Sequence, residues 1–334
     1  MIFAELFLFL IVILIAAEVF TNALEHLGEK LGISEGVTGS LFAAVGTALP
    51  ETSVPLLALM AGTSNAHLNE EIGVGAILGA PLMLSTLSIS LLSFAVLKNR
   101  KVTGHFHPEK TGLKRDLNFF LIAFGFATIA LFVPHEVKAV RYAIGFVMVM
   151  IYFIYIMLTL RASKHLVAEG HATEAESPMF ICRLGLPNHM FVVMLQLLIG
   201  LGLLIAGAKG FISGIEIASD LLGITPLLLS LLVIPIATEL PEKVNSILWV
   251  RKGKDTLAFG NITGALVFQG TLLPAIGIML TPWAPQKEVF AGVVITLLGV
   301  LWLRWMISRG QLRVWHVWLN GLMYLAYLAF TLIK

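Results

Sequence analysis

The sequence has little charge and a single cysteine. Only 13% of its 334 residues are charged, whereas 58% are hydrophobic. A soluble protein carries roughly 25% charged residues, so the composition argues against that class. Cys182 has no second cysteine to pair with, which excludes a disulfide within the chain and a cysteine metal cluster.

The sequence also lacks the signatures of two functional classes. It contains no GxxxxGK[ST] phosphate loop and no Ser/His/Asp signature in a soluble context. We therefore expect a protein that is not an enzyme, uses no organic cofactor and binds no nucleic acid. The start, MIFAELFLFLIVILIAAEVF, lacks a basic n-region and a clear cleavage site, which predicts a first membrane span rather than a signal peptide.

The hydrophobic residues that dominate the chain occur in long blocks. Each block has about 20 residues or more, the length that an α-helix needs to cross a hydrocarbon core. A β-barrel would instead show short segments of alternating polarity. The blocks predict an all-α polytopic membrane protein with ten transmembrane helices, at residues 2–24, 34–62, 71–97, 117–134, 138–160, 190–219, 225–250, 256–280, 287–307 and 313–333.

Lysine and arginine are divided unevenly between the two sides of these spans. The loops that follow odd-numbered spans are rich in both residues, whereas the opposite loops hold few. Because basic loops stay in the cytoplasm, we expect an integral protein of a prokaryotic inner membrane, with both termini outside. Residues 161–189 then form a cytoplasmic linker between two five-helix halves, 1–160 and 190–334.

The two halves contain an internal repeat. The segment that ends in GTALPE at Glu51 aligns without gaps to the segment that ends in ATELPE at Glu242. Further on, GAILGA at 75–80 matches GNITGA at 260–265. The repeated regions are about 34–97 and 225–280. Because each half has an odd number of spans, the halves must be inverted in the membrane, which is the plan of many secondary transporters.

Glu51 and Glu242 both lie in the middle of predicted spans. An ionised carboxylate at the bilayer centre costs about 2.5–3.5 kcal/mol on insertion scales, so such a residue needs a cation, a proton or a basic partner. The pseudo-two-fold axis of an inverted repeat should bring the two glutamates together. Two convergent carboxylates are suited to a hard cation, which prefers oxygen ligands.

The proline before each glutamate supplies a further ligand. Proline has no N–H, so the carbonyl four residues earlier loses its helical partner; these carbonyls belong to Gly46 and Ala237. Thr47 and Thr238 lie four residues before the glutamates and share their helix face. Each threonine either joins the cation site or bonds back to its own helix.

GTALPE and ATELPE, each followed by a G-x-I-x-G element, resemble the two α-repeats of the cation/calcium exchanger superfamily, whose best-known members are sodium/calcium exchangers. The resemblance covers both repeats and the ten-span plan. It implies antiport by alternating access, with Glu51 and Glu242 as shared ligands for Ca²⁺ and Na⁺ and with Thr47 and Thr238 in support. Spans two, three, seven and eight would hold the site while spans one and six slide across it.

The sequence departs from the pattern of that superfamily at several expected ligands. Span three has no polar side chain at the positions that match the superfamily's ligands, whereas span eight offers Asn261 and Gln269. Glu239 replaces a small residue in the second repeat. We therefore expect a divergent member with an asymmetric site.

Two extra charges in the second repeat leave alternatives open. Glu239 lies three residues before Glu242, so the two can share a proton. Lys243 either points away from the site or acts in it as a tethered cation. The alternatives to sodium/calcium exchange are proton-coupled exchange of calcium or another divalent cation, and a non-transporting membrane scaffold or sensor.

Overall fold

The computed structural model describes residues 2–30, 49–61, 65–167, 178–253, 255–310 and 312–332. Within these ranges the chain is almost entirely helical, and the extended structure is one isolated antiparallel bridge between His105 and Arg313. The chain divides into two compact units, Met1–Ala66 with Ile156–Gly223 and His67–Tyr155 with Ile224–Lys334.

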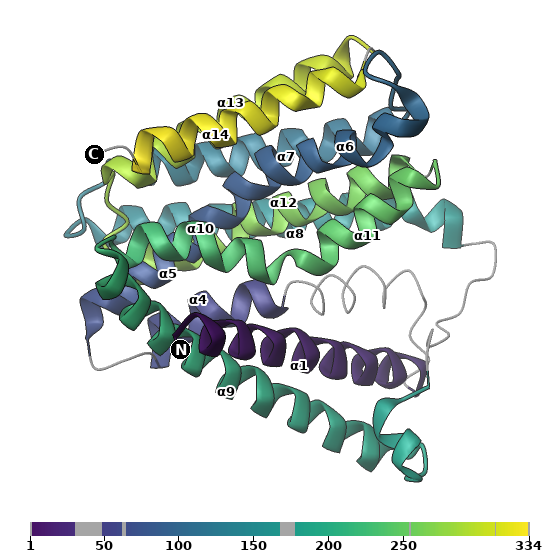
Figure 1. Cartoon of the computed structure of the whole chain (residues 1–334), viewed down its shortest axis with the longest axis vertical. Coiled ribbons are helices and arrows are strands. Elements are labelled where there is room, and N and C mark those ends of the chain that lie inside the picture. Colours follow the sequence, from purple (N-terminus) through teal and green to yellow (C-terminus); the bar gives the residue numbers. More distant parts are fainter. Residues whose placement is uncertain are drawn as a thin grey trace. The chain divides into compact units, whose positions relative to one another are not determined.

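The first unit is built on two long helices that lie side by side, α1 (Ile2–Lys30) and α9 (Met190–Leu222) (Figure 1). They approach closely at Gly200, where an added Cβ would lie 3.0 Å from the Cα of Phe20. The buried Gln196 amide of α9 donates to the Val19 carbonyl and to the Asn22 side chain of α1, each at 2.9 Å. The unit also contains α4 (Leu49–Ala61) and the 3₁₀ turn η3 (Phe180–Leu184).

The second unit holds the remaining helices. In chain order they are α5 (Ala66–Met83), the π-helical turn η2 (Leu84–Ser88), α6 (Ile89–Arg100), α7 (Lys110–Ala130), α8 (Lys138–Val167, which enters the first unit at its end), α10 (Pro226–Thr238), α11 (Leu240–Arg251), α12 (Asp255–Leu280), α13 (Lys287–Ser308), the 3₁₀ turn η4 (Val314–Val317) and α14 (Trp318–Leu332).

Five helical segments among the described residues are long and apolar enough to cross a membrane: Ala66–Arg100, Lys138–Thr159, Met190–Leu222, Ala258–Leu280 and Lys287–Ser308. They differ in how much of their most apolar 18 residues is buried: 72% in the first segment and 67% in the fourth, against 17% in the second. The predicted spans three and eight therefore have the largest buried shares among the five segments. The predicted span 225–250 instead consists of two helices, α10 and α11, that meet at Glu239.

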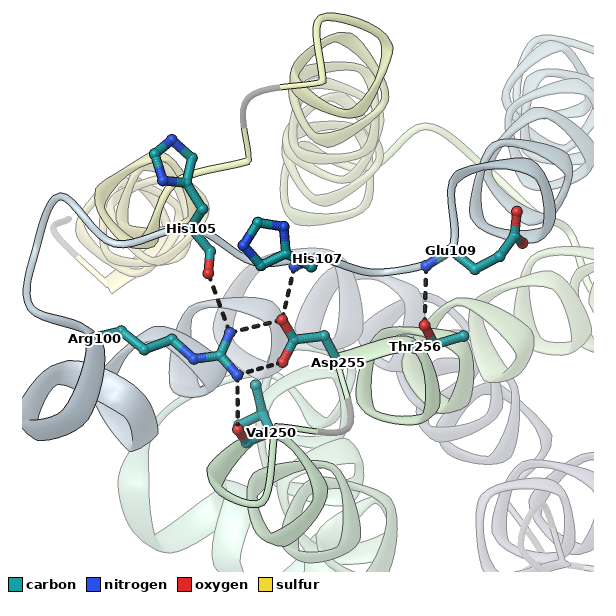
Figure 2. A network of polar contacts seen from close by, with 7 residues as sticks. All are labelled: Arg100, His105, His107, Glu109, Val250, Asp255 and Thr256. Atoms are coloured by element: carbon teal, nitrogen blue, oxygen red, sulfur yellow. Dashed lines mark hydrogen bonds and ion pairs between the residues drawn. The ribbon is translucent and has the colours of Figure 1, made fainter.

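A polar network fastens the N-terminal end of α12 to α6 (Figure 2). The Arg100 guanidinium donates to both carboxylate oxygens of Asp255, at 2.6 and 2.7 Å, and Asp255 also accepts from the His107 N–H at 2.7 Å. Arg100 further donates to the carbonyls of His105 and Val250. Such bidentate, charge-assisted bonds fix both distance and orientation.

Arg141 of α8 fastens the opposite end of α12. Its side chain is buried and donates to four main-chain carbonyls, those of Val133, Ile278, Thr281 and Pro282. Five bonds from one guanidinium use its full set of donors. The positive charge also lies at the C-terminal end of the helix, where the macrodipole favours it.

Candidate functional site

The second signature segment, IATELPE, forms an interruption between two helices. Thr225 caps the start of α10 by accepting from the Leu228 N–H, and Pro226 occupies the first turn, where its missing N–H costs nothing. At Glu239 the backbone takes φ −89° and ψ 7°, the sparsely allowed bridge region in which many active-site residues lie. The next helix, α11, then begins with Leu240 and Pro241.

A buried ion pair lies at this interruption. The Glu239 carboxylate is fully buried and lies 3.3 Å from the ammonium Nζ of Lys243, whose side chain is 7% exposed. Nζ also donates to the Pro235 carbonyl at 3.2 Å and to the Met83 thioether at 2.8 Å. The ammonium therefore donates to one acceptor on α10 and one on α5, and it forms an ion pair with the carboxylate at the junction.

The surroundings of the ion pair are apolar. Met83 belongs to a buried cluster that also contains Leu82, Leu231, Tyr324 and Tyr327. Removing two charges from water into such a cluster is expensive unless they pair closely and keep their hydrogen bonds. Burying the two charges as a pair therefore costs less free energy than burying either charge alone at the same place.

The G-x-I-x-G element of the first repeat lies where α5 crosses α10. An added Cβ at Gly75 would meet the Leu227 carbonyl at 2.5 Å, and one at Gly79 would lie 2.7 Å from Cγ of Pro235. Small residues four apart let two membrane helices approach at backbone distance. The glycines thus bring α5, and with it Met83, against the helix that carries the site.

The polar residues of the second G-x-I-x-G element face two different neighbours. Asn261 of α12 donates to the Ser246 hydroxyl of α11 at 3.0 Å. Thr263 donates to the buried Asp116 of α7 at 2.8 Å, and Asp116 also accepts from the Tyr155 hydroxyl. Gln269, two turns further along α12, is completely buried. Polar groups therefore run along α12 from its first turns to its middle.

The structure places the predicted ligands as follows. Thr238 is buried and its hydroxyl donates to the Ile234 carbonyl at 3.0 Å, which is the back-bonded alternative. Glu239 faces Lys243. Asn261 and Gln269 lie in α12 as described above. Glu51 lies in α4, and Ala237 and Glu242 lie in α10 and α11, but their side chains are outside the part of the chain that the structure describes; so are Gly46 and Thr47 altogether.

Sequence reasoning missed three participants. Met83 and the Pro235 carbonyl contact Lys243, and Asp116 forms a buried polar cluster with α12. Asp116 carried a signal, because it stands at the edge of a predicted span in KRDLNFF. Met83 and Pro235 carried none, since a methionine or a proline in an apolar run is ordinary.

Fold and site together define a class of protein. It is a helical membrane protein in which charged residues interrupt an apolar span. The family described as sodium/calcium exchanger protein matches residues 1–161 and 192–333. The chain therefore belongs to the sodium/calcium exchanger family, whose members are membrane transporters rather than enzymes.

Individual relatives are distant. The inner membrane protein YrbG of Escherichia coli K12 is 24% identical over 273 residues, which cover 82% of this chain and 78% of YrbG. The structure of the H+/Ca2+ exchanger CAX matches 99% of this chain and 86% of CAX, with a TM-score of 0.71 and 17% identity. The sodium-calcium exchanger NCX_Mj matches 98% of this chain and 99% of its own, with a TM-score of 0.58 and 19% identity. At these identities the two structures establish the fold alone.

Proposed function

We propose that the protein is a secondary-active cation antiporter that exchanges sodium for calcium by alternating access. The transported ion binds between Glu51 and Glu242, near the midplane of the membrane. Both repeats supply further oxygen ligands. The first repeat supplies Thr47 and the Gly46 carbonyl. The second supplies Thr238, Glu239, Asn261, Gln269 and the Ala237 carbonyl.

This mechanism rests on an inverted-repeat architecture. Its parts are two five-helix repeats, 1–160 and 190–334, with a cytoplasmic linker at 161–189 and both termini outside. The sequence repeat supports the inversion, because each half contains an odd number of predicted spans. The unequal distribution of lysine and arginine supports the orientation.

One observation carries the proposal: a buried carboxylate stands at a backbone interruption inside an apolar helical unit. Glu239 is fully buried at the α10–α11 junction, and Glu242 follows in the first turn of α11. Interrupted helices that expose carbonyls and helix ends are where secondary transporters bind their ions. Membership of the sodium/calcium exchanger family supports a cation as the cargo.

The direct test is calcium transport into vesicles that contain the purified protein. A sodium gradient should drive uptake of radioactive calcium, and Glu51→Gln and Glu242→Gln should each reduce that uptake to the level of empty vesicles. Glu5→Gln is the matched control, because Glu5 is an exposed carboxylate of α1. Normal transport by both site variants would overturn the site, and absence of transport by the unaltered protein would indicate a non-transporting scaffold or sensor.

Proton-coupled exchange of calcium or another divalent cation is the second candidate. The observation that favours it is the ion pair itself, since Lys243 already supplies positive charge at a place where sodium would otherwise be attracted. The same vesicles distinguish the two candidates. Uptake driven by a pH gradient in sodium-free buffer would favour proton coupling, and a strict sodium requirement would reject it.

A further inference from the structure

We propose that the Lys243 ammonium is a resident cation of the α10–α11 interruption and takes the place of one transported sodium ion. This inference deepens the proposed antiport and rests on it. It makes Lys243 a residue that sets how many sodium ions the protein uses in each transport cycle.

The contacts of Nζ are those that a small cation would seek at this place. Its partners include the Pro235 carbonyl at 3.2 Å, which also accepts the helical bond from the Glu239 N–H, and the Glu239 carboxylate at 3.3 Å. Carbonyls at interrupted helices and carboxylates are the groups that bind sodium in secondary transporters. The third partner, the Met83 thioether, is a weak acceptor that contributes little to a metal ion.

The charge balance points to a monovalent ion. One ammonium against one carboxylate leaves the buried pair neutral, whereas a divalent ion bound to Glu239 alone would leave an uncompensated charge in an apolar cluster. Lys243 is also covalently attached to α11, so it cannot leave with the cargo. The cation at this position is therefore present in every conformation, and no sodium ion needs to enter or leave.

Lys243 does not behave as a lysine that merely crosses an apolar layer. A snorkelling lysine extends its ammonium towards the membrane interface and water. Here the side chain is only 7% exposed, and Nζ is turned back towards the residue one helical turn earlier. The ammonium is thus held by the interruption.

The experiment compares Lys243→Ala with the double variant Glu239→Gln/Lys243→Ala. Alanine removes the charge and opens space for a hydrated ion, while Glu239 remains as the attracting carboxylate. The double variant has the same space without the carboxylate. Lys209→Ala is the matched control, because Lys209 is an exposed lysine of the membrane helix α9.

Two readouts follow sodium separately. In detergent, the apparent Tm is measured in sodium chloride and in choline chloride of equal concentration, and the sodium-specific increase should be larger for Lys243→Ala than for the unaltered protein. In vesicles, sodium-driven calcium transport by Lys243→Ala should depend on sodium more steeply, by about one ion per cycle. The double variant lacks the attracting carboxylate, so its sodium-specific increase in Tm should not exceed that of the unaltered protein. Lys209→Ala should match the unaltered protein in both readouts.

The inference is overturned if Lys243→Ala and the double variant respond to sodium alike while the unaltered protein transports calcium. If the unaltered protein transports no calcium, the proposed function fails, but the Tm comparison still decides whether a sodium ion replaces the ammonium. Should Lys243→Ala fold only in sodium, the inference is supported directly. Should it fold in neither salt, Lys243→Gln, which removes the charge but keeps most of the side-chain length, takes its place with the same expectations.

Discussion

Replacing Gly79 by alanine should separate α5 from α10 and disturb the site. The added Cβ would overlap the Leu231 carbonyl and lie 2.7 Å from Cγ of Pro235. Carbon atoms pack at about 3.5 Å or more, so the contact with Pro235 alone requires the helices to move apart by roughly 0.8 Å. A gap of that size forfeits about a quarter to a half of the dispersion energy of the facing atoms, and overpacking of this kind costs about 1–3 kcal/mol.

Separating α5 from α10 would disturb two contacts of the Lys243 ammonium. Pro235 supplies a carbonyl to the ammonium, and Met83, one turn beyond Gly79, supplies the thioether. At an unfolding entropy of about 2.1 cal/mol/K per residue, a midrange cost of about 2 kcal/mol corresponds to a fall in apparent Tm of about 3 °C. We also expect a lower rate of calcium transport in vesicles, because the partners of the ammonium no longer meet at one point.

The matched control is Gly264→Ala. Gly264 is the corresponding glycine of the second element, and the nearest atom to its added Cβ, the Tyr155 hydroxyl, is 3.9 Å away. That substitution should leave the Tm close to that of the unaltered protein. If Gly79→Ala and Gly264→Ala change the Tm by the same amount, the α5–α10 crossing does not depend on the missing side chain at Gly79.

Two further predictions concern the ends of the helices. Arg141→Lys should lower the stability by about 3 kcal/mol, because an ammonium has fewer donors than the guanidinium and leaves carbonyls unpaired; thermal unfolding checks this against Arg183→Lys, whose guanidinium is exposed. Glu109 caps α7, and although burial raises the pKa of its carboxyl, hydrogen bonds from first-turn N–H groups outweigh burial and lower the pKa overall. Its stabilisation is therefore present above the unfolded-state pKa and lost as the pH falls through the lower folded-state pKa. Glu109→Gln should flatten the dependence of Tm on pH between about pH 5 and pH 3, and an unchanged slope would contradict the capping role.

The sequence predicted the class of fold because apolar block length is a direct physical requirement of the bilayer. It also located the unusual part of the second half, since the proline and the glutamates of ATELPE conflict with an uninterrupted apolar helix. The family match agrees with the resemblance that these residues carry. The ten-helix inverted arrangement and the shared Glu51–Glu242 site stay predictions.

The partners of individual side chains were beyond the reach of the sequence. Spacing suggested that Glu239 shares a face with Glu242, and the structure pairs Glu239 with Lys243 one helical turn away. The hydroxyl of Thr238 donates to the Ile234 carbonyl of its own helix, and this bond uses its proton but not its oxygen lone pairs. Met83 lies at the site because the glycines of α5 allow a close crossing; their spacing indicates such a crossing but not which helix takes part in it.

The fastening of α12 at both ends has a mechanical consequence. The Asp255 end is tied to α6 by Arg100, and the other end is tied to α8 by Arg141. A rod anchored at two points cannot tilt or rotate about its axis unless its anchors travel with it. In any cycle of opening and closing, α6, α8 and α12 must therefore move together as one rigid group. The conformational change has to take place in the segments outside this group.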